Sequence, residues 1–140
     1  MRTTLKNQKG TLILASFVML LFFMAACGGG GQQKAQKERL NEVKESTSQQ
    51  LQKLKMDIDE RIEYIDEQIE NASGELEEQL KEVREELKKQ KDILEKEMEE
   101  VRAASIETWD QVLSSVTKHY QEVRGKTNEV SKKVREMLDD

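Results

Sequence analysis

The residue with the clearest chemical potential in this 140-residue chain is Cys27, its only cysteine. Immediately before it stand Ala25 and Ala26, whose narrow side chains suit the subsites of a processing peptidase. Four glycines follow at positions 28–31, and glycine lets the backbone leave a helix so that an enzyme can reach it. The spacing therefore predicts a cleavage site directly in front of a thiol.

The residues that lead to this site have the pattern of an export signal. The first nine positions contain three basic residues and no acid, and an uncharged run dominated by Leu, Ile, Val, Phe and Met follows at 10–26. A positive start followed by an apolar run is typical of a signal peptide. The continuous apolar part, 12–26, has 15 residues, whereas a helix needs about 20 to cross a bilayer core. We therefore expect 1–26 to be a signal peptide.

The segment Met24-Ala25-Ala26-Cys27, together with the apolar run before it, resembles the lipobox signal of bacterial lipoproteins. The resemblance covers about the first 30 residues, and Met24 stands where such boxes more often carry leucine. It implies removal of residues 1–26, a diacylglyceryl thioether on Cys27 and acylation of its new amine, for example with palmitate. Two or three acyl chains bind a membrane far more firmly than one. Two alternatives are an uncleaved membrane anchor and an ordinary secretory signal that leaves Cys27 free or paired between chains.

After removal of the signal the chain is acidic and poor in large side chains. Residues 27–140 hold all 28 acidic residues and 20 of the 23 basic ones, a net charge of −8, and their only aromatic residues are Tyr64, Trp109 and Tyr120. They contain no proline and are rich in Glu, Lys, Gln, Leu and Arg, a composition that favours long helices. An acidic chain without a basic stripe argues against nucleic acid as a partner.

An apolar stripe runs along the chain at steps of three and four residues. Of its 28 positions 24 are apolar, which indicates helix from about residue 38 onward. Its period of 3.59 residues lies between those of left-handed and right-handed coiled coils and favours nearly straight helices. The stripe consists of Leu40, Val43, Thr47, Leu51, Leu54, Ile58, Ile62, Ile65, Ile69, Ala72, Leu76, Leu80, Val83, Leu87, Gln90, Leu94, Met98, Val101, Ser105, Trp109, Val112, Val116, Tyr120, Val123, Thr127, Val130, Val134 and Met137.

These patterns divide the chain into three parts. Residues 1–26 are the predicted lipoprotein signal peptide. Residues 27–37 contain the lipidated cysteine and a polar, glycine-rich stretch without periodicity, which we expect to be a flexible tether with a reach of about 17 Å. Residues 38–140 are the helical or coiled-coil region.

The stripe has to be buried, and two arrangements would bury it. One continuous helix would be about 150 Å long and would need other chains beside it. A chain that folds back would turn at Gly74, which can take the left-handed conformation that closes a helix. The capping-box spacing of Thr108 and Gln111 indicates a second break near Ser105. The sequence thus predicts an all-α protein: a long amphipathic helix or coiled-coil hairpin with a break at Gly74, or alternatively a three-helix bundle that uses both breaks.

The segment 103–121 contains only three charged residues, and the stripe widens there around a tryptophan and a tyrosine. One interpretation is a broader internal seam against another helix of the same protein. The other is a surface for partner docking, since Trp and Tyr are frequent at binding hot spots. The candidate docking residues are Ile106, Trp109, Val112, Leu113, Val116 and Tyr120.

Catalytic chemistry has little support in the sequence. His119 is the only histidine, and Glu122, three residues later, completes only a two-ligand pair, whereas zinc sites use at least three protein ligands. The glycines at 28–31 lack the Lys and Ser/Thr of a phosphate-binding loop. We therefore expect a protein that is not an enzyme and that holds no cofactor or metal.

Together these features predict a lipid-anchored, non-enzymatic helical spacer or scaffold of the cell envelope, which self-associates as a homo-oligomer or docks an envelope protein. It would lie on an extracytoplasmic membrane face. Gly28 is not the aspartate that retains many lipoproteins at the inner membrane, so the outer membrane is expected in a cell that has two. In a cell with one membrane, its outer face is expected. The alternative is a protein that resembles apolipoproteins, whose amphipathic helices bind lipid.

The order of lipid, tether and helical rod is also similar to the small outer-membrane lipoproteins that tie the membrane to peptidoglycan. Those proteins link to the wall through a C-terminal lysine. Here Lys133 is the last lysine and seven residues follow it. We therefore expect no covalent link to peptidoglycan.

Overall fold

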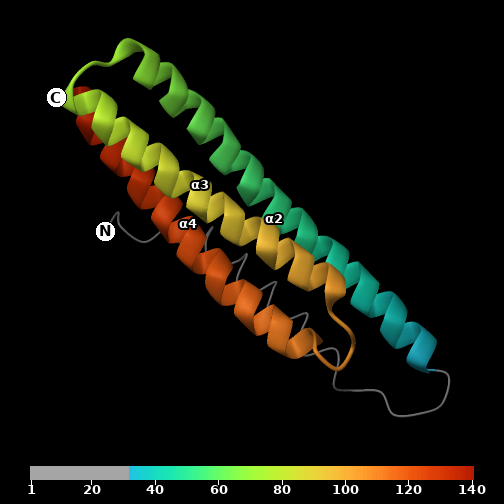
Figure 1. Cartoon of the computed structure of the whole chain (residues 1–140). Coiled ribbons are helices and arrows are strands. Elements are labelled where there is room, and N and C mark those ends of the chain that lie inside the picture. The colour runs from blue at the N-terminus through green and yellow to red at the C-terminus, as the bar shows by residue number, and fades with distance from the viewer. Residues whose placement is uncertain (1–31) are drawn as a thin grey trace, which may run out of the picture. The chain divides into compact units, whose positions relative to one another are not determined.

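The computed structural model describes residues 32–140, so Cys27, the lipobox residues 24–26 and the rest of the predicted signal lie outside the described residues. Residues 36–140 form one compact unit. Three helices make up nearly all of the described chain: α2 (Gln32–Asn71), α3 (Glu75–Ala103) and α4 (Trp109–Asp139) (Figure 1). No strand occurs within residues 32–140, and the predicted all-α class is confirmed.

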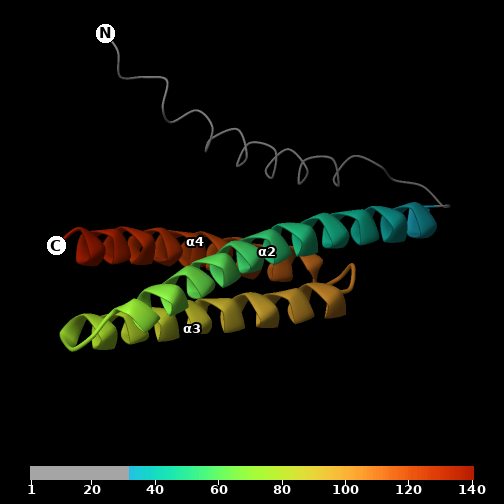
Figure 2. The same cartoon turned by 90° about the horizontal axis from the view of Figure 1, so that it is seen from above.

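The three helices form an up-down-up bundle. α2 and α3 are antiparallel, because ion pairs join Lys55 to Glu95 and, further along α2, Asp66 to Arg84. α4 turns back along α3 and so runs in the same direction as α2 (Figure 1). Seen from above, α2 crosses the α3–α4 pair at an angle, and its C-terminal part lies over α3 (Figure 2). Of the predicted arrangements, the described chain adopts the three-helix bundle.

The predicted stripe forms the core of this bundle. Every stripe position except Ser105 is buried or half-buried, so the apolar faces of the three helices meet inside one chain. Full burial of a large apolar side chain contributes roughly 1.5–3 kcal/mol, and this closure supplies it without a second chain. The most deeply buried apolar residues are Leu51, Ile58 and Ile65 in α2, Leu80, Leu87, Leu94 and Val101 in α3, and Trp109, Val116 and Val123 in α4.

The turn between α2 and α3 confirms the predicted break at Gly74. This residue has φ 65° and ψ −134°, the only positive φ within the described residues, a region that favours glycine because it has no Cβ. Its place in the turn differs from the expectation, since it precedes α3 rather than closing α2. The N–H of Ala72 binds the carbonyl of Ile69 at 3.2 Å, so α2 ends in a tighter turn without a left-handed residue.

The second break falls where the sequence indicated, at 104–108. Thr108 precedes α4, and its carbonyl accepts the N–H of Val112 at 3.0 Å. The predicted capping box with Gln111 is absent here, because Thr108 has φ −100° and ψ −9° instead of the extended conformation that aims a capping side chain at the helix. Its hydroxyl accepts the backbone N–H of Ser105 at 2.9 Å instead, which tightens the loop.

The first described helix begins earlier than predicted. Residues 32–37, assigned above to the tether 27–37, belong to α2. They lack an apolar stripe, and 33–37 are exposed, but Gln, Lys and Ala are all good helix formers. Periodicity detects packing rather than helicity, which is why this extension was missed.

Candidate interaction surfaces

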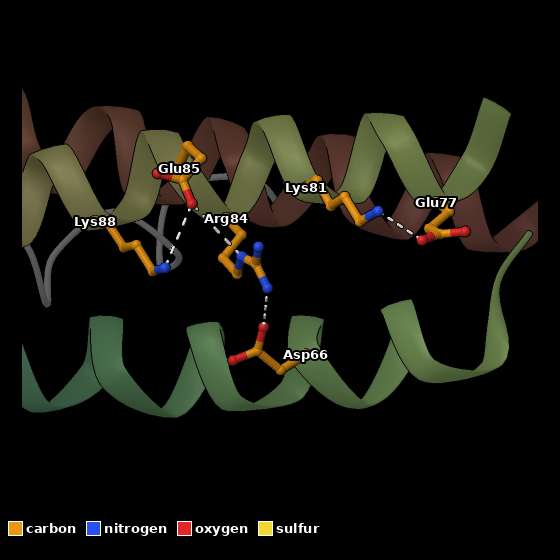
Figure 3. Close-up of polar contacts among 6 residues, drawn as sticks. All are labelled: Asp66, Glu77, Lys81, Arg84, Glu85 and Lys88. Atoms are coloured by element: carbon orange, nitrogen blue, oxygen red, sulfur yellow. Dashed lines mark hydrogen bonds and ion pairs between the residues drawn. The ribbon is translucent and has the colours of Figure 1, made fainter. Parts of the chain in front are cut away.

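The edge between α2 and α3 carries a ladder of ion pairs. Its members are Lys55–Glu95 at 2.9 Å, Asp59–Lys91 at 2.6 Å and Asp66–Arg84 at 2.8 Å, the last shown in Figure 3. A slip of one helical turn in one direction would bring Lys55 opposite Lys91. A slip in the other direction would bring Asp59 opposite Glu95. Since like charges repel, the ladder favours the observed register.

Hydrogen bonds within the ladder raise the proton affinity of its cations. The bond to Asp66 raises the pKa of the Arg84 guanidinium, and the bond to Asp59 raises the pKa of the Lys91 ammonium. These two side chains therefore keep their positive charge at neutral pH.

A second polar contact joins α3 to α4 inside the bundle. His119 Nδ1 contacts Glu97 Oε1, and Glu97 is only 3% exposed. The other carboxylate oxygen, Oε2, is buried without a hydrogen-bond partner among the described residues. The histidine that the sequence offered as a weak metal ligand thus lies beside a carboxylate of another helix. No group of three or more potential metal ligands is placed to hold an ion within residues 32–140.

The six predicted docking residues do not form one exposed patch. Trp109, Leu113 and Val116 are buried, Val112 and Tyr120 are half-buried, and Ile106 is 40% exposed. Lys44 of α2 covers this end of the bundle, since its ammonium donates to the carbonyls of Arg102 and Ala104 at 2.7 and 2.8 Å. These positions agree with the interpretation of a broader internal seam. A partner that docks through Trp109 would have to open the bundle.

An open groove lies between the C-terminal halves of α2 and α4. It has a volume of about 400 Å³, and it occurs where α2 leans away from α4 towards α3 (Figure 2). Tyr64 lines it and is 49% exposed. The floor consists of the core residues Ile65, Leu87, Val130 and Val134. These four are at most 8% exposed, so the apolar surface that the groove offers comes mainly from Tyr64 and from the half-buried Leu138.

The two walls of the groove carry different charges. On the α2 wall, Arg61 Nε pairs with Asp57 Oδ2 at 3.1 Å, and the same guanidinium donates to Ser131 Oγ of α4. Glu60 on the α2 wall and Arg135 on the α4 wall make no ion pair within residues 32–140. Asp139, at the end of the α4 wall, makes no such pair either, so among the described residues the unpaired charges are one acid on the α2 wall and a base followed by an acid on the α4 wall.

Sequence reasoning missed this groove. The stripe names the residues of its floor but not the opening above them, which depends on the angle between α2 and α4. The one available signal was Tyr64, a large aromatic side chain that lies off the stripe.

Comparisons with protein families, with curated proteins and with solved structures find no match to this chain. Within residues 32–140, no helix combines the length and the apolar character that crossing a bilayer requires.

Proposed function

We propose that this chain is a lipid-anchored, non-enzymatic scaffold of the cell envelope, held on an extracytoplasmic membrane face by acyl chains on Cys27 and binding proteins through its three-helix bundle. The observation that carries the proposal is the burial of the stripe inside one chain. Self-association along the stripe, one of the expected modes, would need the bundle to open. Contacts with other proteins therefore use the outer surface, where the groove between α2 and α4 exposes apolar area.

A binding role fits the polar groups of this groove better than catalysis does. Asp57 and Arg61 pair with each other, Glu60 and Arg135 stand on opposite walls, and Asp139 lies at the end of the α4 wall. An active site needs acid, base or nucleophile to converge on one reacting atom. An apolar floor with a charged rim is instead the composition of a protein-binding surface.

The bundle would also act as a spacer. The groove begins at Asp57, which lies 25 residues after Gln32, or about 38 Å along a straight helix. Cys27 precedes Gln32 by five residues. With the acyl chains in the membrane, α2 would hold the groove well away from the lipid headgroups.

The location rests on the lipobox residues 24–27 and on Gly28. In a cell with two membranes the proposal places the protein at the outer membrane, on its periplasmic side or at the surface. In a cell with one membrane it places the protein on the outer face.

The anchoring is tested by replacing Cys27 with Ser in the full-length chain. Cells grown with a labelled fatty acid should label the wild-type protein and not the variant, and mass spectrometry should show that residues 1–26 are absent from the wild type. Gly29→Ser keeps the thiol and the lipobox, so it serves as the control and should be labelled. A wild-type protein that takes up no label, or that keeps residues 1–26, would refute the lipid anchor.

A further inference from the structure

The groove between α2 and α4 is complementary to itself. Glu60 on one wall and Arg135 on the other are both exposed, and neither has an ionic partner within residues 32–140. Asp139 also lines the groove, but it lies one turn beyond Arg135, at the end of α4. Across the central part of the groove, the uncompensated charge therefore changes from negative to positive.

A surface of this kind can pair with a copy of itself in a symmetric dimer, in which the same patch is used on both sides. A two-fold axis can place the groove of one copy against the groove of the other in two orientations. An axis perpendicular to the helices would place α2 over α2, so that Glu60 would approach Glu60 of the other copy. An axis parallel to the helices places α2 over α4, so that Glu60 approaches Arg135. Only the second arrangement pairs opposite charges.

We infer that the groove between α2 and α4 binds the same groove of a second copy of this chain, in a parallel two-fold dimer with two symmetric Glu60–Arg135 contacts. Tyr64 and the half-buried Leu138 supply apolar area beside these contacts. Tyr64 is half exposed at the groove, and tyrosine is enriched in the buried centres of protein interfaces. In the dimer, this side chain and its symmetry mate lie near the axis and cover the floor.

The parallel arrangement is also the one that two anchored copies can adopt. α2 and α4 run in the same direction (Figure 1), so a two-fold axis along the helices brings the Gln32 ends of both α2 helices to the same end of the dimer. Two copies anchored through Cys27 in one membrane can then associate without bending. This last argument rests on the proposed function, whereas the charge pattern of the groove does not.

The experiment compares charge reversals on the two walls in the full-length chain. Glu60→Arg should place a positive charge against Arg135 of the other copy, and Arg135→Glu should place a negative charge against Glu60, so each variant alone should lower self-association by about tenfold or more. A mixture of the two variants, carrying different affinity tags, pairs opposite charges again at both contacts. Co-purification of the two tags from this mixture should therefore recover to the wild-type level.

Matched controls lie on the same helices outside the groove. Glu63→Arg and Lys133→Glu make the same changes of charge at exposed positions that do not line it and should leave self-association unchanged. Circular dichroism of every variant checks that the bundle is folded. Because the reversed residues are exposed and unpaired, no loss of helix is expected.

Three outcomes would overturn the proposal: a monomeric wild-type protein, equal losses in the groove variants and the controls, or a mixture that fails to recover. A monomer whose groove variants lose a cross-link to a different protein would assign the groove to that partner. Repeating the measurement in the Cys27→Ser background separates the two proposals. Cys27→Ser dimers that persist after extraction from the membrane would support the groove dimer independently of the lipid anchor. A wild-type protein that is membrane-bound but monomeric would support the lipid anchor alone.

Discussion

The two interfaces of α3 use polar groups in opposite ways. On the α2 side, the three ion pairs of the ladder lie at a partly exposed edge, beside an apolar seam. On the α4 side, polar groups are buried: Glu97 contacts His119 of α4, and Glu97 and Thr127 are at most 3% exposed. The hydroxyl of Thr127 has no hydrogen-bond partner among the described residues.

The exposed ion pairs therefore act mainly on the register of the helices, whereas the buried polar groups act mainly on the stability of the fold. Exposed pairs contribute little energy each, typically under about 1 kcal/mol, but a slip of the helices turns their attraction into repulsion. Buried polar groups have larger consequences, because a charge without a partner in the interior costs several times as much. We therefore expect the α3–α4 seam to respond strongly to loss of one polar partner, and the α2–α3 edge to respond weakly.

The largest effect should come from Leu87, which is fully buried on α3 and belongs to the apolar core that both interfaces share. Leu87→Ala should lower the free energy of unfolding by about 3 kcal/mol, through lost transfer energy and the cavity left behind. Urea denaturation followed by circular dichroism measures the change. Ile93→Ala is the matched control on the same helix, because Ile93 is 36% exposed, and it should cost far less. Equal losses would mean that α3 does not occupy the centre of the bundle.

Loss of His119 should have the next largest effect. His119→Ala leaves the buried Glu97 without its contact on α4, and we expect a loss of about 2 kcal/mol in the free energy of unfolding. Glu97→Met replaces the carboxylate by an apolar side chain of similar size and should be neutral or stabilising. In the Glu97→Met background, His119→Ala should therefore cost almost nothing. A cost that stays the same in both backgrounds would show that the imidazole acts through packing and not through the carboxylate.

The contrast between the interfaces also explains how much of the fold was predictable from sequence. The stripe identified the core because burial follows spacing along one helix, and Gly74 marked a break because it permits a positive φ. Both are local properties. The arrangement that closes the stripe on itself depends on how the three apolar faces fit together, so the sequence left a single long helix and a bundle both open.

The polar contacts depend on register and were not predictable. Lys91 and Asp59 are 32 positions apart in the sequence, and only the antiparallel pairing of α2 and α3 brings them to 2.6 Å. Trp109 was an ambiguous signal for a related reason, since an aromatic residue on a stripe suits a hot spot and a core equally well. The structure places it at 2% exposure. The groove escaped prediction because it depends on an angle between helices.

The ladder itself should respond weakly and reversibly to charge. Asp59→Lys places two ammonium groups together and should lower the free energy of unfolding by about 0.5–1 kcal/mol at low salt. The double variant Asp59→Lys with Lys91→Asp restores an opposite pair and should recover most of the loss. Glu63→Lys, outside the ladder on α2, is the control and should change little. Failure of the double variant to recover would show that the aspartate acts through something other than this pair.

The smallest expected effect is the pH dependence that the Lys91–Asp59 pair gives to the stability of the protein. The hydrogen bond to Asp59 raises the pKa of Lys91 above its ordinary value of 10.5. The folded protein therefore holds this proton more tightly than the unfolded chain, so the contribution is fully present below the ordinary pKa and is lost as pH rises through the folded value. The urea midpoint of the wild type should fall more steeply above pH of about 10 than that of Asp59→Asn, which lacks the charged partner. Equal slopes of the urea midpoint against pH would mean that the register of α2 on α3 rests on apolar contacts alone. The α2–α3 edge would then differ from the α3–α4 seam only through the buried Glu97 of that seam.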